Sequence, residues 1–233
     1  MVTLLAVARY QSREIMQRFN QELEIDSSDF LEIKRRTAFH EAGHAAAIYL
    51  ENRRKNLPLV YFQIRTRKFC GQATPFFSEI CGGRQIGDGL IMSSASLAER
   101  YNLTDMAAYK TAYEADIINI LAVPLAEAKY EFLRHHQEFS ISALGPDVLR
   151  HYGGSADMQE VWYYLRCVIA SRQEQERTLQ ELFSEAFQFV QEFDNWKQIT
   201  ELAEYILDGT EEYICYEQVN QVFHDYKRCA KIH

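Results

Sequence analysis

The sequence predicts a mainly α-helical protein that forms a single domain over residues 1–233, with a core over about 29–226 and a small β element near residues 59–65. Apolar residues recur with helical spacing along most of the chain. One run of β-forming residues interrupts this pattern, and no repeat, low-complexity tract or linker divides the chain. A length of 233 residues is enough for one large domain.

The first long helical segment reads FLEIKRRTAFHEAGHAAAIYLENRR and follows Ser28 and Asp29, both of which are favourable N-cap residues. Pro58 forbids its continuation, because proline lacks the N–H that a helix interior needs. The next segment, LPLVYFQIRTR, is rich in β-branched and aromatic residues and predicts a strand. Gly71, Pro75 and the segment CGGRQIGDG predict loops and turns.

The rest of the chain returns to helical spacing. SASLAERYN and MAAYKTAYEADIINILAVPLAEAKYEFLRHH predict helices, the second kinked or divided by Pro124. After the loop SALGPDVLRHYGGS, one long helical tract is expected from Asp157 to Phe193. The segments WKQITELAEYIL and YEQVNQVFHDYK predict a closing helix pair around a turn at 208–210.

Composition limits the classes of function. A net charge of −8 argues against broad binding to nucleic acid or to an anionic membrane. The longest apolar stretch, IINILAVPLA, is about half of the ~20 residues that span a bilayer, and MVTLLAVARY has no basic segment ahead of it and makes a poor signal peptide. The five cysteines are odd in number and form no C-x-x-C pair, which predicts reduced, mostly buried thiols in a cytoplasmic, soluble protein.

The segment FHEAGHAAA carries the pattern most typical of chemistry. On a helix, His40 and His44 stand on one face, one turn apart, and can present two imidazole nitrogens to one ion. Glu41 is rotated by roughly 100° from His40 and can reach a water on that ion as a general base. Zn²⁺ suits this set because it accepts nitrogen and carboxylate ligands and keeps one position open for water.

Two alternatives remain open for this helix. The two histidines also fit a packed helix that binds no metal. Gly43 costs about 1 kcal/mol relative to alanine inside a helix, which indicates a close approach to the backbone, either by a ligand or by a neighbouring helix. A catalytic zinc usually has three protein ligands, and the third must come from elsewhere in the chain.

The segment AFHEAGHAAA resembles the zinc-binding helix of the M41 peptidases, the protease domain of the membrane-bound FtsH proteases. YGGSADMQEV resembles the Gly-x-Ser-x-Asp segment of that family, and ILAVPLAEAKYEF resembles the helix between the two motifs. WKQITELAEYIL and YEQV resemble its closing helices, so that the resemblance extends from about Ile33 to Val222. It implies an M41-like helical peptidase domain in which Asp157 is the third metal ligand.

The residues around Asp157 agree with this implication. Ser155 can cap a helix there, which places Asp157 in the first turn, where unpaired N–H groups favour an ionised carboxylate. The chain departs from the family at Val123-Pro124, where the family has a glycine, and at Ala128, which replaces a glutamate. Glu127 remains and is expected to support the site rather than to bind the metal.

The expected function is that of a soluble, ATP-independent zinc metallopeptidase, because the sequence contains no G-x-x-x-x-G-K-[ST] and no membrane anchor. Its substrate would be a peptide, a flexible protein segment or a protein delivered by a partner. The alternative is a catalytically silent, zinc-stabilised adaptor that kept the peptidase fold. The strand LVYFQIRT would either bind substrate at its edge or only cover the core.

The five other histidines are assigned minor roles. His151 could support the metal site from outside the ligand set, and the pair His135-His136 is expected in solvent at a helix end. His224 and His233 are expected at the surface.

Overall fold

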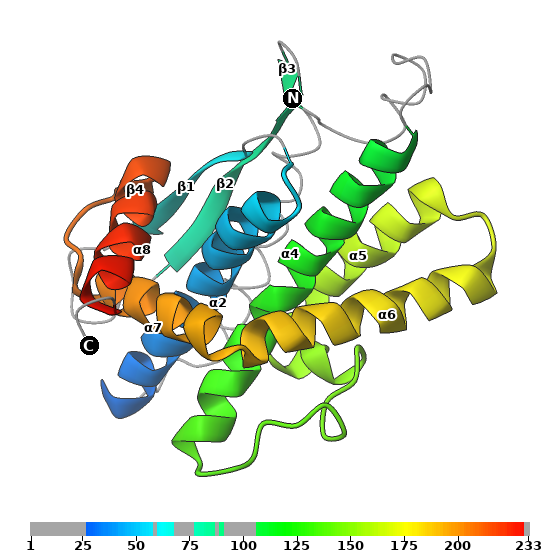
Figure 1. Ribbon diagram of the computed structural model, residues 1–233. Coiled ribbons are helices and arrows are strands. Elements are labelled where there is room, and N and C mark those ends of the chain that lie inside the picture. The colour runs from blue at the N-terminus through cyan, green and yellow to red at the C-terminus, as the bar shows by residue number, and fades with distance from the viewer. Residues whose placement is uncertain (1–26, 58–59, 68–76, 87–88, 91–105, 231–233) are drawn as a thin grey trace.

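A computed structural model describes residues 27–57, 60–67, 77–86, 89–90 and 106–230 (Figure 1). In these ranges the chain is mainly helical, as predicted, and it also forms a small sheet. The elements in chain order are α2 (Ser27–Arg54), β1 (Val60–Arg67), β2 (Phe77–Ile86), β3 (Gly89–Leu90), α4 (Met106–Arg134), the 3-10 helix η1 (Val148–His151), α5 (Ser155–Val168), α6 (Arg172–Gln191), α7 (Phe193–Asp208), β4 (Tyr213–Cys215) and α8 (Tyr216–Ala230).

Helix α2 confirms the first predicted helix, and it ends at Arg54, before Pro58. The chain leaves the helix at Asn56, whose φ of 50° is left-handed. The Asn56 N–H donates to Arg53 O, and the Leu57 N–H donates to Asn52 O at 2.9 Å. This hydrogen-bond pattern is the Schellman motif, and asparagine is one of the residues that accept its left-handed position.

Helix α4 is a single helix that Pro124 does not divide. It runs antiparallel to α2, since Arg134 near its end pairs with Glu32 near the start of α2 (3.1 Å) and Glu127 pairs with His40 further along. The two helices lie side by side in the middle of the molecule (Figure 1). Small residues allow this close contact, because Gly43 of α2 lies against Ala122 and Ala126 of α4, which are completely buried.

The tract expected as one long helix after Ser155 is two helices, α5 and α6, which is a correction. Ile169 is extended (φ −127°, ψ 117°) and ends α5, and Ser171 begins α6 by accepting a hydrogen bond from the Glu174 N–H on its side chain. Ser171 and Glu174 have the spacing of a capping box, a start signal that helical periodicity does not reveal. The closing pair α7 and α8 confirms the prediction, and the turn between them contains the unpredicted strand β4.

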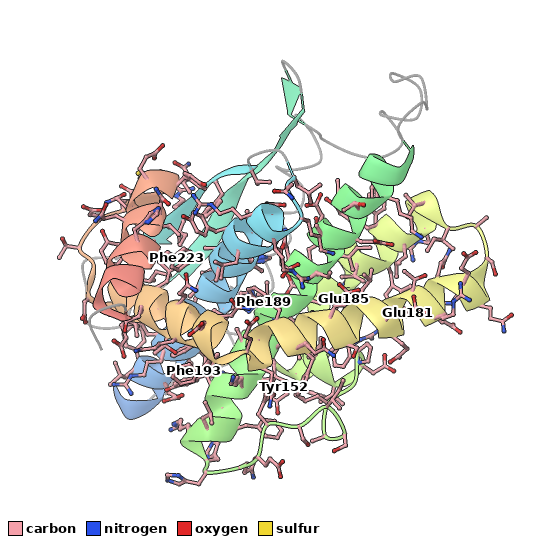
Figure 2. All side chains as sticks on the ribbon, viewed as in Figure 1. Tyr152, Glu181, Glu185, Phe189, Phe193 and Phe223 are labelled. Atoms are coloured by element: carbon pink, nitrogen blue, oxygen red, sulfur yellow. The ribbon has the colours of Figure 1, made fainter. Side chains whose placement is uncertain are left out.

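The turn between α6 and α7 is tight, with Glu192 as the residue that separates the two helices. Figure 2 labels Phe189 and Phe193, which lie on either side of this turn. Phe189 is 5% exposed and belongs to the core, whereas Phe193 is 74% exposed. The core extends from this turn to α8, where Phe223 is 1% exposed.

Strand β1 confirms the predicted β element, but the segment Cys81–Ile86, expected as a loop, belongs to strand β2. The sheet order is β3-β2-β1-β4, and Ile64 of β1 lies opposite Ile80 of β2 on one side and Ile214 of β4 on the other. Pairing along eight residues with β1 overrides the weak strand preference of Gly82 and Gly83.

The position of β1 inside the sheet bears on the two roles considered for it. Because β1 is paired with both β2 and β4, it is not a free edge at Gln63–Arg65, and a substrate strand cannot be added at these three residues. Phe62 and Ile64 are 5% and 0% exposed, so the strand covers the core. The segment SASLAERYN and residues Gly71 and Pro75 lie outside the described residues.

None of the helices in the described part of the chain is long and apolar enough to cross a membrane.

Candidate metal centre

Helix α2 brings His40 and His44 together, one helical turn apart on the same face. Their ring centroids are 5.9 Å apart, and their side chains are 16% and 15% exposed. The alanines in the same turns of α2, Ala42, Ala45, Ala46 and Ala47, are completely buried. The two imidazoles are therefore fixed by a packed helix and still accessible at their edges.

Asp157 reaches these histidines from the first turn of α5. Its Oδ2 lies 3.8 Å from Nε2 of His40, and its Oδ1 lies 4.0 Å from Nε2 of His44. The residue is 1% exposed. Asp157 and the two histidines are more than a hundred residues apart in the chain, and nothing in the local sequence requires them to be close. The packing of α5 on α4 brings them together.

Close contact between α4 and the start of α5 holds Asp157 in place. A Cβ on Gly154 would lie 2.8 Å from Cβ of Pro124, so only glycine allows this approach. Ser155 was expected to be the N-cap of this helix. It is instead the first residue of the helix, and Gly154 occupies the N-cap position. Asp157 nevertheless lies in the first turn, where the helix dipole favours its ionised form.

The three donor groups fit a metal ion. One ligand atom from each of His40, His44 and Asp157 can be chosen so that all three lie within 4.8 Å of one another. Zinc bonds of ~2.1 Å at tetrahedral angles place neighbouring donors ~3.4 Å apart, so the 3.8 and 4.0 Å separations would have to shorten by about 0.4 and 0.6 Å around an ion. Two imidazoles and one carboxylate are also a donor set that a divalent transition metal accepts. The group can hold a metal ion.

Glu127 of α4 contacts this group through His40 and does not belong to the three donors. Its Oε2 lies 3.1 Å from Nδ1 of His40, the ring nitrogen that points away from Asp157. A carboxylate only accepts hydrogen bonds, so Nδ1 carries the hydrogen and Nε2 is the nitrogen that faces the other ligands. Arg36 donates to the second oxygen of Glu127 through Nε (3.0 Å) and Nη2 (2.6 Å).

Burial and neighbouring charges give the two histidines very different pKa values. Burial alone would lower the pKa of His40, but the hydrogen bond to Glu127 and the charges of Asp157, Glu41 and Glu127 outweigh it and raise the pKa to about 9. For His44, burial and the neighbouring positive charge of His40 lower the pKa to about 3. Burial raises the pKa of Glu127, but its hydrogen bond with His40 and the charges of His40 and Arg36 lower it overall.

The surroundings of the centre are rich in carboxyl groups. Glu41 is 5% exposed and belongs to the same turn of α2 as His40. Glu160 lies one turn after Asp157, and burial together with the charges of Asp157 and Asp116 raises its pKa to about 7. Carboxylates held this close to one another favour the arrival of a cation, which offsets their repulsion.

The structure decides the role of Gly43. A Cβ at this position would lie 2.8 Å from Cβ of Ala126 and 3.3 Å from O of Ala122, both on α4. Of the two reasons considered for this glycine, tight helix packing is therefore the correct one.

The other described histidines do not belong to the three-donor group. His151 is exposed on η1. His135, His136 and His224 are exposed, as predicted, and His233 lies outside the described residues.

Two residues of the site were not predicted. Arg36 lies four residues before His40 on α2, and this spacing could have indicated that both contact one partner. Gly153 lies in the YGGS segment and packs against the His40–Glu127 pair. It follows Tyr152, which is labelled in Figure 2 below the start of α5.

Comparisons of the chain with protein-family models, with curated proteins and with solved structures find no match. The interpretation of this centre therefore rests on its residues and their geometry.

Proposed function

We propose that the protein is a zinc metallopeptidase that hydrolyses peptide bonds. The observation that carries this proposal is the convergence of His40, His44 and Asp157 on one point, next to a glutamate that directly follows the first histidine. An open catalytic zinc site combines three protein ligands with a general base, and these four residues would supply both. The resemblance of AFHEAGHAAA and YGGSADMQEV to the M41 peptidases supports the same reaction.

The three ligands would hold Zn²⁺, which supplies a Lewis acid and lowers the pKa of a water ligand to about 7. Glu41 would act as the general base that takes a proton from the attacking water. It would then give that proton to the leaving amine as the C–N bond breaks. A carboxylate placed beside a cation and held in a largely buried position suits both steps.

The remaining residues would set the geometry before the reaction. Glu127 orients the His40 ring through Nδ1 and so directs Nε2 towards Asp157. Arg36 keeps Glu127 ionised and in place by two hydrogen bonds to its other oxygen. We propose that hydrolysis needs no ATP and acts on peptides or flexible segments.

The test combines metal analysis with peptide hydrolysis on protein purified without a histidine tag. We expect about one zinc per chain in the wild type and in Glu41→Gln, and much less in Asp157→Ala. Hydrolysis of a mixed, fluorescence-quenched peptide library should occur with the wild type alone. Zinc bound without any hydrolysis would favour the zinc-stabilised adaptor, and a wild type that binds no zinc would refute both functions.

A further inference from the structure

Gly153 lies where the chain turns into α5, two residues before the helix begins and four before Asp157. Its φ of 76° is in the left-handed region, which residues with a Cβ adopt at a cost. Backbone conformation alone would explain a glycine here. The contacts around it add a second reason.

A side chain at Gly153 would enter the hydrogen bond that orients His40. A Cβ built there would lie 2.6 Å from Oε2 of Glu127, 3.1 Å from Nδ1 of His40 and 3.2 Å from Cε1 of the same ring. The first two atoms are the two ends of the 3.1 Å hydrogen bond between Glu127 and His40. The missing side chain therefore leaves the space in which this hydrogen bond forms.

Neither partner can move aside easily. Glu127 is 4% exposed, and Arg36 holds its other oxygen with hydrogen bonds of 3.0 and 2.6 Å. A carboxylate pushed away from Gly153 would have to break these bonds or leave His40. The other packed glycines near the site differ in this respect, because Gly43 and Gly154 face alanine, proline and backbone atoms.

We propose that Gly153 is a positioning residue for the metal ligand His40 and acts through Glu127. Its lack of a side chain allows the backbone before α5 to close against the hydrogen bond, which fixes the His40 ring with Nε2 towards Asp157. The same short segment thus delivers one ligand, Asp157, and locks the orientation of another, His40. This proposal rests on the metal site of the proposed function, but not on catalysis.

The test measures zinc affinity by competition with a chromophoric chelator, in a double-mutant cycle of Gly153→Ala and Glu127→Ala. In the wild-type background, Gly153→Ala should weaken zinc binding by about 10- to 100-fold, the loss typical of a disturbed partner of a metal ligand. In the Glu127→Ala background the same substitution should change the affinity less than about 3-fold, because the group that it displaces is gone. The midpoint of thermal unfolding of the metal-free protein should fall in both backgrounds, since backbone strain at φ 76° is present in both, and it should fall further where Glu127 is present to be displaced.

Two further variants keep the test interpretable. Gly153→Asn carries the same Cβ but tolerates a left-handed backbone better, so it should fold more readily and lose zinc affinity to a similar extent. Gly145→Ala is the matched control, because a Cβ there meets nothing within 4 Å. Equal losses of zinc affinity in both backgrounds, or no loss in the wild-type background, would overturn the role of Gly153. A wild type that binds no zinc would instead refute the proposed function.

Discussion

The Oε2 atom of Glu127 lies 3.1 Å from Nδ1 of His40 and connects α4 to the helix that carries both candidate histidine ligands. Metal-binding histidines commonly donate their second N–H to such a carboxylate, which fixes the ring and raises its basicity. We expect Glu127→Gln to lower zinc affinity about 10- to 100-fold, because the neutral amide neither attracts the N–H as strongly nor pairs as well with Arg36. Competition titration with a chelator measures this change.

Glu131→Gln provides the control for that substitution. Glu131 also contacts Arg36, at 3.3 Å from Nε, but it is not a partner of His40. Its replacement should leave zinc affinity within a factor of about 3 of the wild type. Equal effects of the two substitutions would mean that the network acts through Arg36 and not through the histidine.

Zinc should stabilise the fold through the three ligands. At a free zinc concentration 100 times the dissociation constant, one site that binds only the folded state adds about 2.7 kcal/mol to the free energy of unfolding. For a chain of this size that corresponds to a rise of roughly 5–11 °C in the unfolding midpoint. Calorimetry should show this rise in the wild type and its absence in Asp157→Ala. A rise of the same size in Asp157→Ala would show that Asp157 is not a ligand.

Glu41→Gln should separate metal binding from catalysis. The amide has almost the same shape as the carboxylate but cannot accept a proton, so we expect hydrolysis to fall by about 10²- to 10⁴-fold. Zinc content should stay at the wild-type level, as measured by elemental analysis of the same samples. Retained hydrolysis in Glu41→Gln would rule out Glu41 as the general base.

Gly43→Ala should destabilise the protein although alanine favours helix. The gain in helix propensity is about 1 kcal/mol, whereas overpacking of a filled contact costs about 1–3 kcal/mol. Here the new methyl would lie 2.8 Å from Cβ of Ala126, which is rigid, so we expect overpacking to dominate. The double variant Gly43→Ala/Ala126→Gly should recover part of the loss in urea denaturation. No recovery would show that the contact with Ala122 O matters more.

The buried amine of Lys129 should make the stability of the protein depend on pH. Its side chain is 8% exposed and donates to O of Val190 at 2.8 Å, and burial lowers its pKa to about 8. The unfolded chain, with its ordinary lysine pKa, then binds more protons than the folded chain between about pH 8 and 10. Stability should therefore rise with pH across this window.

The control for this prediction is Lys129→Met, which has no titrating group at that position. The free energy of unfolding of both proteins is measured by denaturant unfolding between about pH 7.5 and 10, the window that these two pKa values set. The difference between the two proteins isolates the contribution of Lys129. The free energy of unfolding of the wild type should increase relative to that of the variant as the pH rises. A constant difference between the two proteins would mean that the amine is not perturbed.

The sequence by itself determined the parts of this protein that depend on local spacing. Helical periodicity predicted α2, α4 and the closing pair, and the four-residue interval between His40 and His44 placed both imidazoles on one face. A helix repeats every 3.6 residues whatever surrounds it, so the intervals along the chain are sufficient for such predictions. Asp157 was assigned to the site by resemblance, because its spacing from the histidines carries no geometric information.

Only the tertiary structure decided which distant groups meet. The glycines of β2 suggested a loop, but pairing with β1 made that segment a strand, and β4 removed the free edge expected at β1. The same helical period that predicted one long tract could not show the break at Ile169–Ser171. Packing of α5 on α4 brings Asp157 to within 4.0 Å of both histidines, and packing of Ala126 explains Gly43. These contacts join segments far apart in the chain, and their energy depends on how whole helices and strands fit together rather than on local sequence.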